Sequence, residues 1–163
     1  MNKKHLWTVL LAAAMIGSVW ADEEEAEPVN LALGAKATAS SVEAGDNIKD
    51  GGKPSLAVDG KLDTRWGSEH RIDPSWITLD LGTAKTFQTV RLYWEGSYAK
   101  EYDLEASDDG KTWKKIYEQK EGNGKLENVT LEQPVTTRYF RLLGKKRATQ
   151  WGYSLWEIQL FAE

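Results

Sequence analysis

The sequence predicts an all-β fold of the sandwich or jelly-roll class. From Asn30 onward, short runs of alternating apolar and polar residues are separated by turn residues about every ten positions. No stretch has a sustained helical period, apart from a single turn that PSLAVDG (54–60) could form. Many short, evenly spaced strands in one continuous pattern are typical of a β-sandwich. We therefore expect one domain, residues 30–163.

Most of the predicted strands alternate along their length, so that one face is apolar. The predicted strands are 76–81, 89–94, 101–106, 126–131, 137–143 and 154–161. In the first of them, Ile77, Leu79 and Leu81 share a face. After the third, the Asp-Gly pair of SDDGKTW (107–113) indicates a hairpin turn.

The last strand and the segment before it contain two tryptophans with different expected environments. Trp156 is in register with Ile158 and Leu160, so we expect it in the core. Trp151 follows Gln150 and precedes Gly152, outside any strand pattern. We therefore expect it in a loop. The alternative is that Trp151 packs as a plug over the end of the sandwich, because large aromatic side chains are seldom left in water.

The N-terminal 29 residues are not expected to belong to the domain. MNKKH, the apolar run that follows and SVWA have the layout of a secretory signal peptide, with cleavage after Ala21. The apolar run is shorter than the roughly 20 residues that a membrane-spanning helix needs. Residues 22–29 (DEEEAEPV) form an acidic leader that we expect to be disordered. With no cysteine for lipid attachment, we expect a secreted or periplasmic protein.

Charge and composition exclude several functions. Removal of Lys3 and Lys4 with the signal peptide (1–21) leaves 25 acidic residues against 19 basic ones, an excess of six that does not suit a nucleic-acid backbone. The chain has no cysteine, so disulfides, thiolate catalysis and cysteine-based zinc sites are excluded. Catalytic zinc held by a histidine cluster is also excluded, since His70 is the only histidine beyond the signal peptide. No G-x-S-x-G motif accompanies that histidine. We expect no enzymatic activity.

Several motifs together resemble a known family. In chain order they are NLALGAKATASS, AVDGKLDTRWGS, DPSWITLDLG, VRLYWE, EASDDGKTW, RYFRLLGKK and YSLWEIQLF. They resemble the discoidin (coagulation factor 5/8 type C) domain, and more closely its bacterial branch, carbohydrate-binding module family 32. The pairing of VRLYWEGSYAKEY with KKRATQWGYSLWE resembles modules of chitosanases and β-glucan-degrading enzymes. The resemblance implies an eight-stranded antiparallel β-sandwich, of the galactose-binding-domain-like jelly-roll type, with a shallow sugar site in loops at one end. The segment 43–54 departs from the pattern because it is longer and more charged.

A calcium site is predicted between the 56–64 segment and the last strand. Calcium prefers six to eight oxygen ligands. Asp59 and Thr64 offer side-chain oxygens across the turn at Gly60, and Glu157 can complete the site. The resemblance implies the same three side chains. It also implies carbonyl ligands, which are those of Leu56, Lys61, Thr64 and Trp156. The role would be structural, and the alternative is an ordinary Asx-turn beside a solvated glutamate.

The resemblance also implies a binding face. Trp151 would stack on a sugar ring, and Glu43 and Glu95 would hydrogen-bond the sugar's polar groups. The secondary contacts would be Tyr98, Arg147 and Tyr153. Two carboxylates favour an amine, so chitosan fragments are the expected ligand, with β-glucan close behind. Galactose-type ligands are the third option, through His70 and Arg71.

We therefore expect a secreted, non-catalytic carbohydrate-binding module. Its partner would be an oligosaccharide or polysaccharide, and it could serve a carbohydrate-active enzyme. The alternative is an adhesion domain that binds a protein or a phospholipid surface with the same loops. The acidic charge argues against anionic lipid, and only KKR (145–147) favours it. A third reading, loops that pack on a sister subunit, stays open.

Overall fold

The computed structural model describes residues 28–44 and 52–162. The predicted signal peptide, most of the acidic leader and the middle of the 43–54 segment lie outside the described residues. Within the described part of the chain, no helix is long and apolar enough to cross a membrane.

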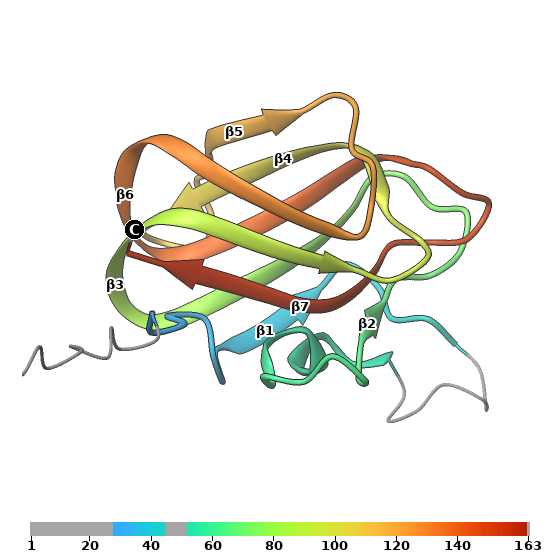
Figure 1. The fold of residues 1–163 in the computed structure, drawn as a ribbon, viewed down its shortest axis with the longest axis horizontal. Coiled ribbons are helices and arrows are strands. Elements are labelled where there is room, and N and C mark those ends of the chain that lie inside the picture. Colours follow the sequence, from blue (N-terminus) through green and yellow to red (C-terminus); the bar gives the residue numbers. More distant parts are fainter. Residues whose placement is uncertain (1–27, 45–51, 163) are drawn as a thin grey trace, which may run out of the picture.

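The described chain is almost entirely β-structure, as predicted (Figure 1). The strands are β1 (Lys36–Ala39), β2 (Trp66–Gly67), β3 (Ser75–Trp94), β4 (Ala99–Ser107), β5 (Lys114–Gln119), β6 (Leu126–Arg147) and β7 (Ser154–Phe161). The single turn predicted in PSLAVDG is a 3-10 helix, η2 (Pro54–Val58). The seven strands follow the order β2-β7-β3-β6-β4-β5, with β1 paired to β3.

Two long strands bend and serve both layers of the sandwich. The first part of β3 (75–80) pairs with β1 and with the last part of β6, whereas its last part (89–94) pairs with β7 and the first part of β6. The β3–β6 register shifts between Asp80 and Lys85, and again between Phe87 and Thr89. The predicted strands 76–81 and 89–94 are therefore two halves of β3. The described residues accordingly form seven strands, where the resemblance implied eight.

The apolar faces of both layers form one core. It contains the predicted inward residues of both halves of β3, among them Ile77, Leu79, Val90 and Leu92, which are fully buried. Burial of this apolar surface supplies the main stabilisation of a domain that has no disulfide.

The expectation that Trp156 lies in the core is wrong. In the β3–β7 pairing, Tyr93 faces Glu157 but Trp94 faces Leu155, so Trp156 is the extra residue of a β-bulge. The bulge reverses the alternation. Leu155, with Ile158 and Leu160, is fully buried, and Trp156 is only half-buried.

Four connecting segments gather at one end of the sandwich, at the right of Figure 1. They are 41–44, 68–74, 95–98 and 148–153. The C-terminal end of the described chain lies at the opposite end, where the backbone N–H of Leu31 donates to the carbonyl of Leu160 at 2.8 Å. Leu31 and Leu160, near the start of the first described segment and the end of the last, therefore lie side by side at the end opposite the four loops.

Candidate functional site

A pocket of about 590 Å³ opens between these four segments. Its volume is within the range of small-molecule sites. Its lining residues are Glu43, Arg65, Ser68, His70, Glu95, Gly96, Ser97, Thr149, Gln150, Trp151, Gly152, Tyr153 and Ser154. Five of the predicted ligand residues are among them: Glu43, His70, Glu95, Trp151 and Tyr153.

Trp151 is exposed at the pocket, as predicted from the absence of a strand pattern around it. The residue is 49% exposed, although its backbone is held in place. Its N–H donates to Thr149 Oγ1 at 3.2 Å, and its carbonyl accepts from Arg147 Nη1 at 3.2 Å. The indole therefore offers a flat apolar surface on an ordered loop.

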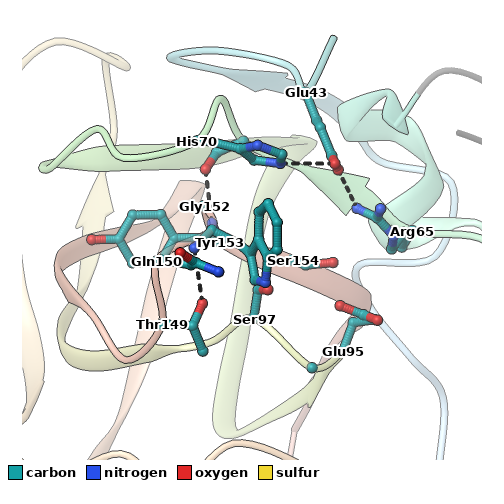
Figure 2. Close-up of a pocket in the computed structure, with 13 residues that line it drawn as sticks. Glu43, Arg65, His70, Glu95, Ser97, Thr149, Gln150, Gly152, Tyr153 and Ser154 are labelled. Atoms are coloured by element: carbon teal, nitrogen blue, oxygen red, sulfur yellow. Dashed lines mark hydrogen bonds and ion pairs between the residues drawn. The ribbon is translucent and has the colours of Figure 1, made fainter. Parts of the chain in front are cut away.

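Glu43 is held by two partners on one wall of the pocket (Figure 2). Arg65 Nη1 donates to Glu43 Oε2 at 2.7 Å, and His70 Nε2 lies 2.9 Å from Oε1. Burial by itself would raise the pKa of Glu43, but the hydrogen bonds and charges of Arg65 and His70 hold it below its ordinary value. Gly67 permits this close packing, because a Cβ there would lie 2.5 Å from both Arg65 Nη1 and Glu43 Oε2. Both carboxylate oxygens of Glu43 are thus already engaged.

Glu95 differs from Glu43 in having no partner for its carboxylate within the described chain. Its backbone N–H donates to the carbonyl of Ser154 at 2.9 Å, which fixes the main chain. In Figure 2 the Glu95 carboxylate lies apart from the Glu43, Arg65 and His70 group, with no interaction drawn to it. Glu95 is consequently the carboxylate of the pocket that is free to accept from a ligand.

Ser97 and Ser154 are two of the three serines that line the pocket, and none of the three was singled out from the sequence. Ser97 and Ser154 are buried, and the N–H of Ser154 donates to the carbonyl of Ser97 at 2.7 Å. The hydroxyl of Ser154 is buried and has no hydrogen-bond partner in the described chain. Serines are common in turns, so nothing in the local pattern distinguished these two.

The other three predicted residues lie beside or behind the pocket, and a fourth, Tyr153, lines it with a buried side chain. Tyr98 packs on Gly124, where a Cβ would come within 2.7 Å of its ring, and Tyr98 does not line the pocket. Arg71 is exposed with a backbone φ of 62° and is not part of the lining either. Arg147 lies behind the 148–153 loop, bonded to its carbonyls. Tyr153 lines the pocket, but its side chain is 1% exposed and packs on Gly144. The structure therefore does not bring these four side chains to the pocket as exposed polar contacts.

The residues of the predicted calcium site converge beside β7. Gly60 N–H donates to Glu157 Oε1 at 3.2 Å, and Thr64 Oγ1 donates to Asp59 Oδ2 at 2.8 Å. Glu157 is fully buried, and its Oε2 has no hydrogen-bond partner in the described chain. Burial, with the neighbouring Asp59 charge, raises the pKa of Glu157 to about 7. No group of three or more His, Cys, Asp or Glu side chains is arranged for a metal in the described residues, so any ligand set here must include other oxygens.

Comparison with known proteins gives the family. The profile of the F5/8 type C domain matches residues 36–158, about three quarters of the chain. The chain belongs to the F5/8 type C (discoidin) family. None of the curated proteins compared with this discoidin domain matches it.

Solved structures resemble this discoidin domain over nearly their whole length. Chitosan-binding module 1 of a chitosanase/glucanase from Paenibacillus sp. IK-5 is 38% identical, with a TM-score of 0.73, covering 82% of this chain and 98% of that one. Module 2 of the same enzyme, solved with chitotriose, is 34% identical, with a TM-score of 0.72 and coverages of 81% and 99%. A Clostridium perfringens carbohydrate-binding module of family 32, solved with GalNAc-β-1,3-galactose, is 24% identical, with a TM-score of 0.69 and coverages of 79% and 96%. That last likeness is one of fold. The predicted family and β-sandwich fold are confirmed.

Proposed function

We propose that this discoidin domain is a non-catalytic carbohydrate-binding module for glucosamine-containing chains of the chitosan type. The observation that carries the proposal is the combination of an exposed indole and an unpartnered carboxylate, Trp151 and Glu95, in one pocket. The resemblance to two chitosan-binding modules at 34–38% identity supports the same ligand class.

Trp151 would provide the apolar contact. One face of a pyranose ring carries C–H groups with a weak positive charge, and these are attracted to the negative π face of an aromatic ring. Because Arg147 and Thr149 hold the backbone of Trp151, little ordering of this loop is needed on binding.

Glu95 would select for the amine. A glucosamine unit carries an ammonium group, which forms a charge-assisted hydrogen bond with a carboxylate about twice as strong as a neutral one. Glu43 is less suited to this task, since Arg65 and His70 already occupy both of its carboxylate oxygens. We assign to Glu43 the role of orienting Arg65 and His70, whose remaining N–H groups would donate to sugar hydroxyls.

The state of Glu43 argues against hydrolysis at this pocket. A glycosidase needs one carboxyl group whose pKa is raised, so that it can donate a proton to the leaving group. Arg65 and His70 lower the pKa of Glu43. We therefore propose that the domain binds sugar and does not cleave it.

The binding test is isothermal titration with a glucosamine trimer, using the wild type and Trp151→Ala. We expect wild-type affinity near the millimolar level, about −4 kcal/mol, and loss of measurable binding in the variant. Trp113→Ala is the matched control, because Trp113 lies on the β4–β5 connection outside the pocket. Cello-oligosaccharides and galactose test the β-glucan and galactose options. Retention on anionic vesicles without sugar binding would instead favour the phospholipid alternative.

We also propose a structural calcium ion held by Asp59, Thr64 and Glu157, with the carbonyls of Leu56, Lys61, Thr64 and Trp156. The residues fit a cation because the buried Glu157 carboxylate has one oxygen without a partner and faces a second carboxylate, Asp59. When bound, the ion would supply positive charge that offsets this buried negative charge and ties the 56–64 segment to β7.

Thermal melts test the ion directly. Calcium at about a hundred times its Kd should stabilise the fold by about 2.7 kcal/mol, which raises the Tm by several degrees. Chelator should reverse the shift, and Glu157→Gln should abolish it, whereas Glu132→Gln at an exposed site should not. A Tm that is indifferent to calcium in the wild type would remove the ion from the proposal.

We propose that the protein is secreted or periplasmic and that it works beside a carbohydrate-active enzyme. The signal-peptide pattern of residues 1–21 supports the location. N-terminal mass spectrometry of the exported product should find Asp22 as its first residue. An uncleaved N-terminus would contradict this.

A further inference from the structure

Asp73 connects the 68–74 segment to two residues of the neighbouring 147–153 segment. Tyr153 donates its phenolic O–H to Asp73 Oδ1. Arg147 Nε lies 3.0 Å from Asp73 Oδ2 and forms an ion pair with it. The Nε–H bond does not point at this oxygen, so the contact is not a hydrogen bond. One carboxylate thus contacts a residue on each side of Trp151 in the chain.

Arg147 passes this connection on to the backbone of Trp151. Its Nη1 donates to the carbonyl of Trp151 at 3.2 Å and, more weakly, to that of Gln150 at 3.4 Å. The Arg147 side chain is only 19% exposed, so water competes little for these contacts. The guanidinium therefore lies between the Asp73 carboxylate and the peptide that carries the indole.

Tyr153 secures the other side of Trp151. Its N–H donates to Ser68 Oγ at 2.8 Å, and its carbonyl accepts from the N–H of Ser68 at 2.8 Å. Its ring packs on Gly144, where a Cβ would lie 2.5 Å from the ring edge. Burial, together with the hydrogen bond to Asp73, raises the pKa of the Tyr153 phenol, so that it stays a donor.

We propose that Asp73 is a positioning residue for Trp151, acting through Arg147 and Tyr153 to hold the indole in the orientation that stacks on sugar. We call these three residues the Asp73 network. Asp73 is not among the lining residues of the pocket, so its effect on binding would be indirect. An indole held in place before binding saves the ordering cost that a mobile loop would incur. The inference rests on the proposed function only where it is tested by sugar affinity.

The test uses Asp73→Asn, which keeps an oxygen for Tyr153 but removes the negative charge that faces Arg147. Loss of a contact to a charged group changes a binding or folding equilibrium constant by about tenfold or more. We therefore expect about a tenfold loss of affinity for the glucosamine trimer. The second readout is the emission of Trp151, obtained as the spectrum of each protein minus that of the same protein carrying Trp151→Phe. We expect a shifted maximum and greater acrylamide quenching in Asp73→Asn.

The matched control is Asp80→Asn. Arg138 donates through Nε and Nη2 to the two carboxylate oxygens of Asp80, each at 2.9 Å. Neither residue lines the pocket. We expect this control to leave both affinity and Trp151 emission unchanged. If Asp73→Asn does not fold, Arg147→Met removes the same link from its other side and is read in the same way.

Unchanged Trp151 emission in a folded Asp73→Asn overturns the proposal, whether affinity falls or not, since the effect would then not pass through the indole. Unchanged affinity with shifted emission overturns it as well. The emission measurement needs no ligand. If the wild type binds no sugar, the proposed function fails while the emission data still decide whether Asp73 positions Trp151.

Discussion

The imidazole of His70 lies edge-on to the indole of Trp151, with ring centroids 5.1 Å apart and an interplanar angle of 66°. The same imidazole bonds through Nε2 to Glu43 at 2.9 Å. His70 therefore connects the carboxylate wall of the pocket to its exposed aromatic residue. From the sequence, the only role expected for His70 was a contact to a galactose-type ligand. The geometry adds a second role in which His70 supports Trp151.

Replacement of His70 should separate these two contacts. His70→Phe keeps a ring beside Trp151 but loses the bond to Glu43, whereas His70→Ala loses both. An edge-to-face aromatic pair contributes about 0.5–1.5 kcal/mol. We expect His70→Ala to lower affinity for the glucosamine trimer by about two- to tenfold more than His70→Phe does. Titration calorimetry measures both. Equal losses would show that the ring contact contributes nothing.

The two pocket glutamates should differ in selectivity. Glu95→Gln removes the unpartnered charge, so affinity for the glucosamine trimer should fall about tenfold or more, while affinity for its N-acetylated counterpart changes little. Glu43→Gln should weaken both ligands to a similar extent, because it releases Arg65 and His70. Glu132→Gln, at an exposed carboxylate outside the pocket, is the control. A Glu95→Gln variant that loses both ligands equally would contradict amine selection.

The Glu43 contacts should make stability depend on pH in acid. The folded-state pKa of Glu43 lies below its ordinary value of 4.5, since Arg65 and His70 favour the ionised form. The resulting stabilisation is complete above the unfolded-state pKa and is lost as the pH falls through the lower folded-state value. The difference in Tm between the wild type and Glu43→Gln should therefore be largest near neutral pH and shrink below about pH 4. Circular dichroism melts over this range measure it, and a difference that widens in acid would be the opposite result.

Gly152 should not tolerate a side chain. A Cβ at this position would lie 2.6 Å from the Ser68 carbonyl oxygen and 2.8 Å from that of Glu69, and a backbone contact of this kind cannot move cheaply. We expect Gly152→Ala to destabilise the fold by about 1–3 kcal/mol and to weaken sugar binding. Gly96→Ala is the control in the same pocket, as a Cβ there meets nothing within 4 Å. Denaturant unfolding of the two variants gives the comparison.

Much of the β-structure could be predicted from local pattern. The alternation in 101–106 and 154–161 located β4 and β7, the latter with its observed bounds. The alternation could not reveal the bulge at Trp156, because an extra residue is defined only against the partner strand. It also could not tell that two predicted strands are halves of one bent strand, β3. Such a bend depends on which strands each half pairs with.

The exposure of Trp151 was predictable, whereas the state of its neighbours was not. A tryptophan between Gln150 and Gly152 has no strand pattern to bury it, and it is exposed. Tyr153 follows two residues later and looks equally polar in context, yet it is buried on Gly144. Glu43 and Glu95 looked alike as loop carboxylates. Only the approach of Arg65 and His70 makes the first a satisfied ion and leaves the second free.

The sequence by itself determined the all-β class, the family and the loop that carries Trp151, because these follow from periodicity and from motifs that are contiguous in the chain. The tertiary structure decided which carboxylate is free, which aromatic residue is buried and how Asp73 reaches Arg147 and Tyr153. The side-chain contacts of Glu43 and Asp73 join residues that are 22 to 80 positions apart in the chain. No local pattern encodes such distances, since they arise only when the bent strands bring the loops to one end of the sandwich.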